Sequence, residues 1–357
     1  MTTPERREIG ALTAVRGHLA LWVVVYHFWN EVVVLVPWAR PAAPVAALGH
    51  MAVPAFFMLS GFVLSYNYAA RFAVLRRREV ARFLVLRLAR VYPVHLVTLL
   101  AVAAMVWVAG RAGYQLTDAG YSTADFVRNV FLVHTWVPHF RLNWNYPSWS
   151  ISSEWFAYLL FPLVAAVVLR RLTSPRRGAV FAAVCLAGSV GMAWWRPWPY
   201  FELVLVVPTF LTGAGLFAAT RDLPPARWRW WPEVCVVATA ACCFLPAKDV
   251  ATCAMFATLF FLILALARVG PRCGALWTSR PAVFLGEVSY SLYMTHTLAQ
   301  KLLYRLLPVV RFESADPFTR FGVLLAYAGL VAGCCLVTYY LVERPCRRWF
   351  KKVATRG

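Results

Sequence analysis

The first apolar segment of the chain, residues 15–36, carries an arginine at one end, Arg16, and a histidine in its middle, His27. A segment of this length can cross a bilayer, because roughly 20 apolar residues suffice. Arg16 and His27 are separated by about three helical turns, so their side chains share one helix face, about 16 Å apart along the axis. We expect the arginine at the membrane surface and the histidine near mid-depth. A histidine at that depth serves a binding site or proton pathway, or is satisfied by a neighbouring helix.

His27 is the candidate general base, since a neutral imidazole in a low-dielectric site can accept a proton near neutral pH. Glu31 lies one turn further along the same helix. It can pair with His27 or reach the outer interface, and both readings stay open. Glu154, in the segment SWSISSEWFAYLLFP, is a second carboxylate at membrane depth and needs a partner. It can orient His27, bind an acceptor molecule or form a structural ion pair with an arginine.

Arg87 and Arg90 begin a later apolar segment, in the motif RLARVYP. Their spacing of three puts both on one helix face, beside the cytoplasmic surface. A guanidinium group can bind a phosphate through two hydrogen bonds, although such residues also reach out to lipid phosphates. Because Arg16 is expected at a similar depth, we favour a shared site for a phosphate-bearing ligand.

The segment GEVSYSLYMTH places Tyr290, Tyr293 and His296 at three-residue spacing, on one helix face. His296 is a second intramembrane histidine, which helps to bind substrate or forms a hydrogen bond between helices. Trp149 belongs to a Trp/Tyr-rich run at the expected outer rim. Such rings stack on sugar faces or form an interfacial belt.

The composition is that of an integral membrane protein. Of 357 residues, 61% are hydrophobic and 14% are charged, whereas soluble domains are about 45–50% apolar and about 25% charged. The net charge of +21 does not indicate a nucleic-acid partner, because a polytopic protein collects basic residues in its cytoplasmic loops. The nine cysteines include no CxxC pair and lie mostly in apolar segments, so we predict neither a disulfide framework nor a metal site.

The apolar segments predict an all-α fold with about ten transmembrane helices. With the N-terminus inside, 23 Lys and Arg residues fall in cytoplasmic segments and 8 outside, which places both termini in the cytoplasm. We expect a single domain, 1–357, in which the spans occupy 15–342 and a basic tail follows at 343–357. The expected spans are 15–36, 43–68, 83–109, 148–169, 179–195, 201–219, 233–247, 250–267, 282–307 and 319–342.

Two further patterns bear on helix packing and on the outer loop. Ser60 and Gly61, in FFMLSGFVLSY, are small residues that allow close helix packing. The longest outer loop, 110–147, contains an amphipathic segment that begins at Thr123.

Taken in order, six motifs resemble those of the membrane-bound acyltransferase 3 family, which includes bacterial O-acetylases of polysaccharides. Each motif is weak alone, but together they follow the family order over nearly the whole chain. One departure is the entry to the first helix, where Thr13 stands in place of an aspartate. The matching residues are Arg16 and His27; Phe56 to Phe62; Arg87, Arg90, Tyr92 and Pro93; Trp149, Ser150, Glu154, Tyr158 and Pro162; Ser289, Tyr290, Tyr293 and His296; and Glu343 and Pro345.

The resemblance implies an enzyme of the bacterial inner or plasma membrane that needs no resident cofactor. It takes an acyl group, expected to be acetyl, from acyl-CoA as co-substrate and transfers it to a hydroxyl. The acceptor is a sugar polymer, a lipid-linked precursor or a secondary metabolite. The implied roles are base for His27 with Glu154 in support, donor binding for Arg16, Arg87 and Arg90, and substrate binding for Tyr290, Tyr293, His296 and Trp149.

The main rival is a proton-coupled transporter. His27, Glu154 and His296 could form a proton relay through the membrane. No paired halves or inverted repeat are evident in the sequence, which disfavours this reading.

Overall fold

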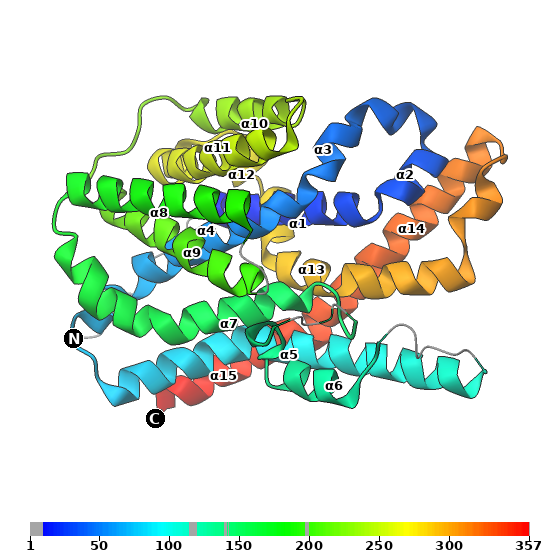
Figure 1. Ribbon diagram of the computed structural model, residues 1–357, viewed down its shortest axis with the longest axis horizontal. Coiled ribbons are helices and arrows are strands. Elements are labelled where there is room, and N and C mark those ends of the chain that lie inside the picture. The colour runs from blue at the N-terminus through cyan, green and yellow to red at the C-terminus, as the bar shows by residue number, and fades with distance from the viewer. Residues whose placement is uncertain (1–9, 114–119, 139–140, 142, 197–199, 357) are drawn as a thin grey trace. The chain divides into compact units, whose positions relative to one another are not determined.

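The structure is a computed structural model that describes all residues except 1–9, 114–119, 139–140, 142, 197–199 and 357. Every regular element in the described part is helical, which confirms the all-α class (Figure 1). The helices are α1 (Gly10–His27), α2 (Trp29–Leu35), α3 (Ala43–Ala47), α4 (Ala52–Tyr68), α5 (Arg77–Arg111), α6 (Thr123–Val130), α7 (Ser148–Leu163), α8 (Pro175–Trp195), α9 (Phe201–Thr220), α10 (Trp231–Cys242), α11 (Lys248–Val269), α12 (Ala275–Thr278), α13 (Arg280–Leu306), α14 (Pro317–Thr338) and α15 (Arg344–Arg356).

Seven helical stretches of the described chain are long and apolar enough to cross a membrane, or eight if the bent pair α1 and α2 forms one span. These stretches identify a multi-pass membrane protein. The ten expected spans all fall largely on helical residues. The first, 15–36, covers the bent pair α1 and α2, and two others do not meet both criteria. Helix α10 has 12 residues, too few to cross hydrocarbon without help, and α13 has 27 residues but carries several charged and hydroxyl side chains. The count of ten, and the cytoplasmic position of both termini, stay predictions.

The chain folds into two compact units, each built from three segments. Unit 1 comprises Met1–Leu19, Leu48–Ala81 and Phe156–Glu287. Unit 2 comprises Ala20–Ala47, Arg82–Trp155 and Val288–Gly357. The expectation of one functional domain over the whole chain stays a prediction.

In unit 1, helix α9 packs against both α8 and α4, and α10 lies along α11 (Figure 1). The crossing of α4 and α9 is close because both helices have a glycine there. A β-carbon at Gly61 would overlap the carbonyl oxygen of Phe210, and one at Gly213 would overlap that of Met58. The two backbones are therefore in direct contact, as small residues permit in membrane proteins. The packing role predicted for Gly61 is confirmed.

In unit 2, the apolar segment that begins the chain is broken. Helices α1 and α2 meet at an angle of 73°, with Phe28 between them in a non-helical conformation. The short α2 packs against α14, and the ring of Phe28 meets that of Tyr327 edge-on at 6.3 Å. The bend places the end of α1, and with it His27, inside the unit.

The loop 110–147 contains the expected amphipathic helix, α6. The side chain of Ser122 caps its first turn by accepting a hydrogen bond from the backbone N–H of Asp125 at 3.0 Å. The same hydroxyl donates to the Asp125 carboxylate at 2.8 Å. This reciprocal cap explains why the helix begins at Thr123.

Candidate functional site

His27 is the last residue of α1, and its ring is held by the turn before it. Its Nδ1 lies 2.9 Å from the carbonyl oxygen of Val23 and 3.2 Å from Nε2 of His296. The rings of His27 and His296 are 4.8 Å apart, and Tyr146 contacts His27 edge-on at 5.2 Å. The two intramembrane histidines that the sequence singles out are thus in direct contact.

The hydrogen-bond acceptors determine which nitrogens of the two rings carry protons. A backbone carbonyl can only accept, so Nδ1 of His27 carries the hydrogen that points to Val23. By the same argument, Nδ1 of His296 carries the hydrogen that points to the carbonyl of Tyr293, 2.7 Å away. A neutral His296 then has its lone pair at Nε2, so the single hydrogen on Nδ1 of His27 is shared between the carbonyl of Val23, the nearer acceptor, and Nε2 of His296. The remaining nitrogen, Nε2 of His27, is buried and has no hydrogen-bond partner among the described residues.

Gln300 ties α13 to the bend between α1 and α2. Its amide donates to the carbonyl oxygen of His27 at 2.7 Å and to the Glu31 carboxylate at 2.9 Å. The last carbonyl groups of a helix lack donors within the helix and need hydrogen-bond donors from elsewhere. The bend after α1 leaves the carbonyl of His27 accessible to the Gln300 amide. Glu31 is 2% exposed, so it links to His27 through Gln300 and does not extend to an outer surface. Sequence reasoning missed Gln300, although it lies one turn after His296 on the same helix.

The predicted face of Tyr290, Tyr293 and His296 exists, but each member contacts a different part of unit 2. The hydroxyl of Tyr290 donates to the carbonyl of Val91 on α5 at 2.5 Å. The hydroxyl of Tyr293 lies 2.9 Å from that of Ser150 on α7. All three residues of this face are buried. Their observed contacts join α13 to α1, α5 and α7, and their role in binding substrate stays a prediction.

Glu154 and Trp149 both lie on α7 and are half-buried. Glu154 is one helical turn after Ser150, so the carboxylate shares the helix face that meets Tyr293. This places Glu154 in the same unit as His27 and His296. Its predicted catalytic role and the substrate contact of Trp149 stay predictions.

The predicted donor-binding arginines divide between the two units. Arg87 and Arg90 lie on α5 in unit 2, and Arg16 lies on α1 in unit 1. The guanidinium of Arg87 lies over the ring of Phe83, 5.8 Å from its centroid, and Nη1 of Arg90 is 3.9 Å from Glu343. Arg87 and Arg90 are both half-buried and lie on the same helix, α5. The site that they are predicted to share with Arg16 stays a prediction.

A second buried polar cluster of unit 2 joins the loop 110–147 to α5 and α7. Nε2 of His95 donates to the carbonyl of Asn129 at 2.8 Å. Nε2 of His134 lies 3.3 Å from the hydroxyl of Ser148, which donates to the carbonyl of Asn145 at 2.7 Å. The rings of His95 and His134 are nearly parallel, with centroids 6.4 Å apart. These contacts hold the loop against the helices.

Acid is expected to weaken this cluster at His134. Burial, and secondarily the neighbouring His95, lower the pKa of His134 from 6.5 to about 3. His134 therefore binds a proton near pH 6.5 in the unfolded chain, whereas it stays neutral at that pH in the folded chain. The contribution of His134 to the free energy of unfolding is therefore fully present above pH 6.5. It falls as the pH drops toward 3, by about 1.4 kcal/mol per pH unit for one proton. The thermal midpoint of wild type in detergent should fall more steeply between pH 6.5 and 4.5 than that of His134→Gln; equal slopes would contradict this assignment.

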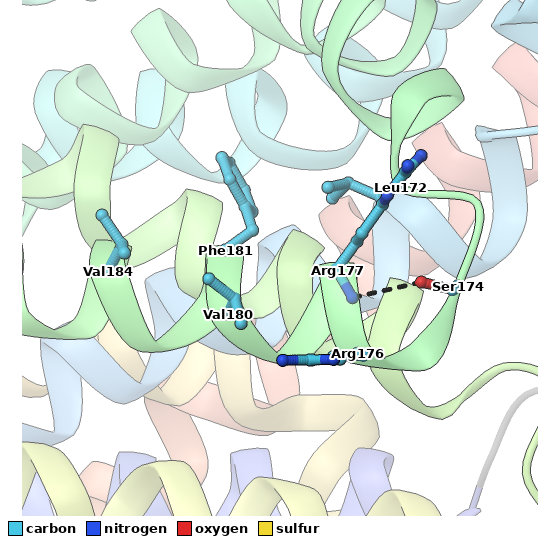
Figure 2. Close-up of a pocket in the computed structure, with 7 residues that line it drawn as sticks. All are labelled: Leu172, Ser174, Arg176, Arg177, Val180, Phe181 and Val184. Carbon is cyan, nitrogen blue, oxygen red and sulfur yellow. Dashed lines mark hydrogen bonds between the residues drawn. The ribbon is translucent and has the colours of Figure 1, made fainter.

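Unit 1 has a groove of about 590 Å³ at the start of α8, and it contains none of the predicted site residues. Figure 2 shows Val180, Phe181 and Val184 along the helix, with Arg176 and Arg177 near its first turn. The backbone N–H of Arg177 donates to the Ser174 side chain at 3.3 Å, which caps the helix. The groove is open and mostly apolar, and we assign it no part in the chemistry.

Comparisons with known proteins agree with the resemblance noted above. Residues 9–342 match the acyltransferase 3 family, which is described as an acyltransferase domain. The chain is 29% identical to the acyltransferase MdmB of Streptomyces mycarofaciens, over 85% of this chain and 82% of that protein. It is 23% identical to a candidate acetyltransferase, ORF330 of Acidianus two-tailed virus, over 91% of this chain and 94% of that protein. No solved structure matches. Because the family covers nearly all of the chain, the protein is a member of the acyltransferase 3 family.

Proposed function

We propose that this protein moves an acyl group, acetyl in the first instance, from cytoplasmic acyl-CoA to a hydroxyl of a carbohydrate or natural-product acceptor. The observation that carries the proposal is the state of His27. Its Nδ1 is occupied by Val23 and His296, and its buried Nε2 has no partner in the described part of the chain. A general base needs such an available lone pair, oriented by hydrogen bonds at the other nitrogen.

In the proposed reaction, Nε2 of His27 accepts the proton of the acceptor hydroxyl as its oxygen attacks the thioester carbonyl. The new C–O bond forms and the C–S bond breaks, and the thiolate of CoA leaves. That thiolate takes the proton from the His27 imidazolium, which restores the neutral ring. No covalent intermediate with the enzyme is required. His296 keeps the ring oriented, and Glu154 orients either His27 or the acceptor.

Arg87 and Arg90 supply the proposed contacts to the donor, with Arg16 as a third. CoA carries several phosphate charges, and guanidinium groups are suited to bind them. Tyr290, Tyr293, His296 and Trp149 are the proposed contacts to the substrate. The acceptor is a sugar polymer, a lipid-linked precursor or a secondary metabolite, and the proposed location is a bacterial cell membrane. The names of the two relatives, an acyltransferase and a candidate acetyltransferase, support the acyl and acetyl assignments.

The transporter reading draws support from one observation, the 3.2 Å contact between His27 and His296, since a proton can pass between two such rings. Family membership favours the enzyme. The acyltransferase reading predicts that purified protein in nanodiscs binds CoA saturably, with a Kd between about 1 µM and 1 mM. Titration calorimetry measures this. Absence of CoA binding, together with proton-driven uptake of a solute by proteoliposomes, would favour the transporter.

A further inference from the structure

A fully buried carboxylate lies where three helical segments of unit 2 meet. The side chain of Glu343 is 0% exposed. The hydroxyl of Ser291 on α13 donates to its Oε2 at 2.7 Å. On the other oxygen, Nη1 of Arg347 lies 3.4 Å away and Nη1 of Arg90 lies 3.9 Å away. One carboxylate therefore faces guanidinium groups from two different helices, α5 and α15.

Local geometry explains why Glu343 can reach both. A π-helical turn, Tyr339–Glu343, joins α14 to α15, and such turns rotate the side chains that follow them. Arg347 is one turn after Glu343, on the same helix face. On the other side, the hydrogen bond from Tyr290 to the carbonyl of Val91 anchors α13 beside Arg90. The three segments are thus fixed around the carboxylate.

Arg90 on α5 has a hydrogen-bond donor that its described contacts do not use. Nη2 of Arg90 is buried and has no hydrogen-bond partner among the described residues. A buried N–H without an acceptor is costly, and a native structure rarely leaves one without a purpose. Because Nη1 of Arg90 faces Glu343 at 3.9 Å and Nη2 does not, an anionic ligand is the natural acceptor for Nη2. A guanidinium presents its N–H groups in a planar fork, so part of it can hold a carboxylate while the rest binds phosphate.

We propose that Glu343 is a positioning residue that holds Arg90 and Arg347 side by side, and that Arg347 is a further ligand for the phosphates of acyl-CoA. This inference rests on the proposed function and extends the proposed donor site to α15. It adds a contact from the C-terminal helix α15 to those proposed for Arg87 and Arg90 on α5. A lipid headgroup offers the same phosphate chemistry, so the test must separate the two sources.

The test compares Arg347→Gln and Glu343→Gln with the control Arg348→Gln. Arg348 is the next residue on α15, is exposed and has no ion pair with Glu343 in the structure. We expect Arg347→Gln to raise the KM for acetyl-CoA about tenfold and to leave kcat within about twofold, because it removes a charge-assisted contact to the bound donor. Binding of 3′-phosphoadenosine 5′-diphosphate, the phosphate-bearing part of CoA, should weaken by the same factor. Arg348→Gln should change neither value.

Each outcome has a distinct meaning. Equal effects of Arg347→Gln and Arg348→Gln, or none from Arg347→Gln, would overturn the inference. A loss of thermal stability in anionic lipid without a change in KM would assign Arg347 to lipid instead and would also overturn it. Failure of wild type itself to bind CoA would remove the proposed function, and the inference with it. Glu343→Gln should raise KM as Arg347→Gln does; if that variant does not fold, Arg347→Gln decides alone.

Discussion

Replacing His27 with alanine is expected to lower kcat by about 10²- to 10⁴-fold, the range that a positioned general base contributes. The variant loses the lone pair at Nε2 that accepts the proton of the attacking hydroxyl. The affinity for CoA should stay within about threefold, because no phosphate contact is assigned to His27. The measurement is the rate of CoA thiol release at saturating donor and acceptor, with CoA binding measured on the same samples.

The matched control for this prediction is His18→Ala. His18 is a histidine on the same helix, half-buried, with Nδ1 3.0 Å from the carbonyl of Ala14 and its ring against Trp277. His18 therefore tests the effect of replacing a histidine on α1 that has no proposed part in the reaction. Its kcat should stay within about threefold of wild type. A loss of equal size in both variants would indicate damage to α1 and would remove the reason to call His27 the base.

Replacing Gly61 with alanine is expected to destabilise unit 1 by about 3 kcal/mol or more, at or beyond the upper end of ordinary overpacking. The added β-carbon would overlap the backbone carbonyl of Phe210, and a backbone atom cannot rotate away as a side chain can. Helices α4 and α9 would have to separate. The expected result is loss of monodisperse protein after detergent extraction, or a large drop in thermal midpoint.

Gly191→Ala on α8 is the control for the packing prediction. A β-carbon there meets no heavy atom within 4 Å among the described residues, so the substitution should be neutral or slightly stabilising. If Gly61→Ala behaves like Gly191→Ala, the close crossing of α4 and α9 does not exist in the membrane.

The sequence predicts much of the fold because periodicity and hydropathy are local properties. The helix class, the face shared by Tyr290, Tyr293 and His296, and the start of α6 at Thr123 follow from spacing and capping alone. The bend at Phe28 does not, because neither proline nor glycine marks it. Its stabilising contacts come from α13 and α14, which are remote in sequence.

The partners of the site residues are harder to predict for the same reason. The pairing of His27 with His296 joins residues far apart in the chain, and spacing within one helix cannot reveal it. Gln300 belongs to no motif noted in the sequence. Its role becomes apparent only from its contacts with the carbonyl of His27 and the carboxylate of Glu31. The short α10 and the polar α13 show why hydropathy alone leaves the number of spans open.

The central claim, acyl transfer from CoA with His27 as base, is tested most directly by CoA thiol release from acetyl-CoA, followed for wild type and His27→Ala in parallel nanodisc preparations. The assay contains a mixture of carbohydrate and natural-product hydroxyl acceptors. We predict acceptor-dependent release by wild type and a rate at least about 10²-fold lower in a folded His27→Ala. Equal release by the two proteins would contradict the role of His27, and binding of CoA without release by either protein with any acceptor would contradict the transfer itself.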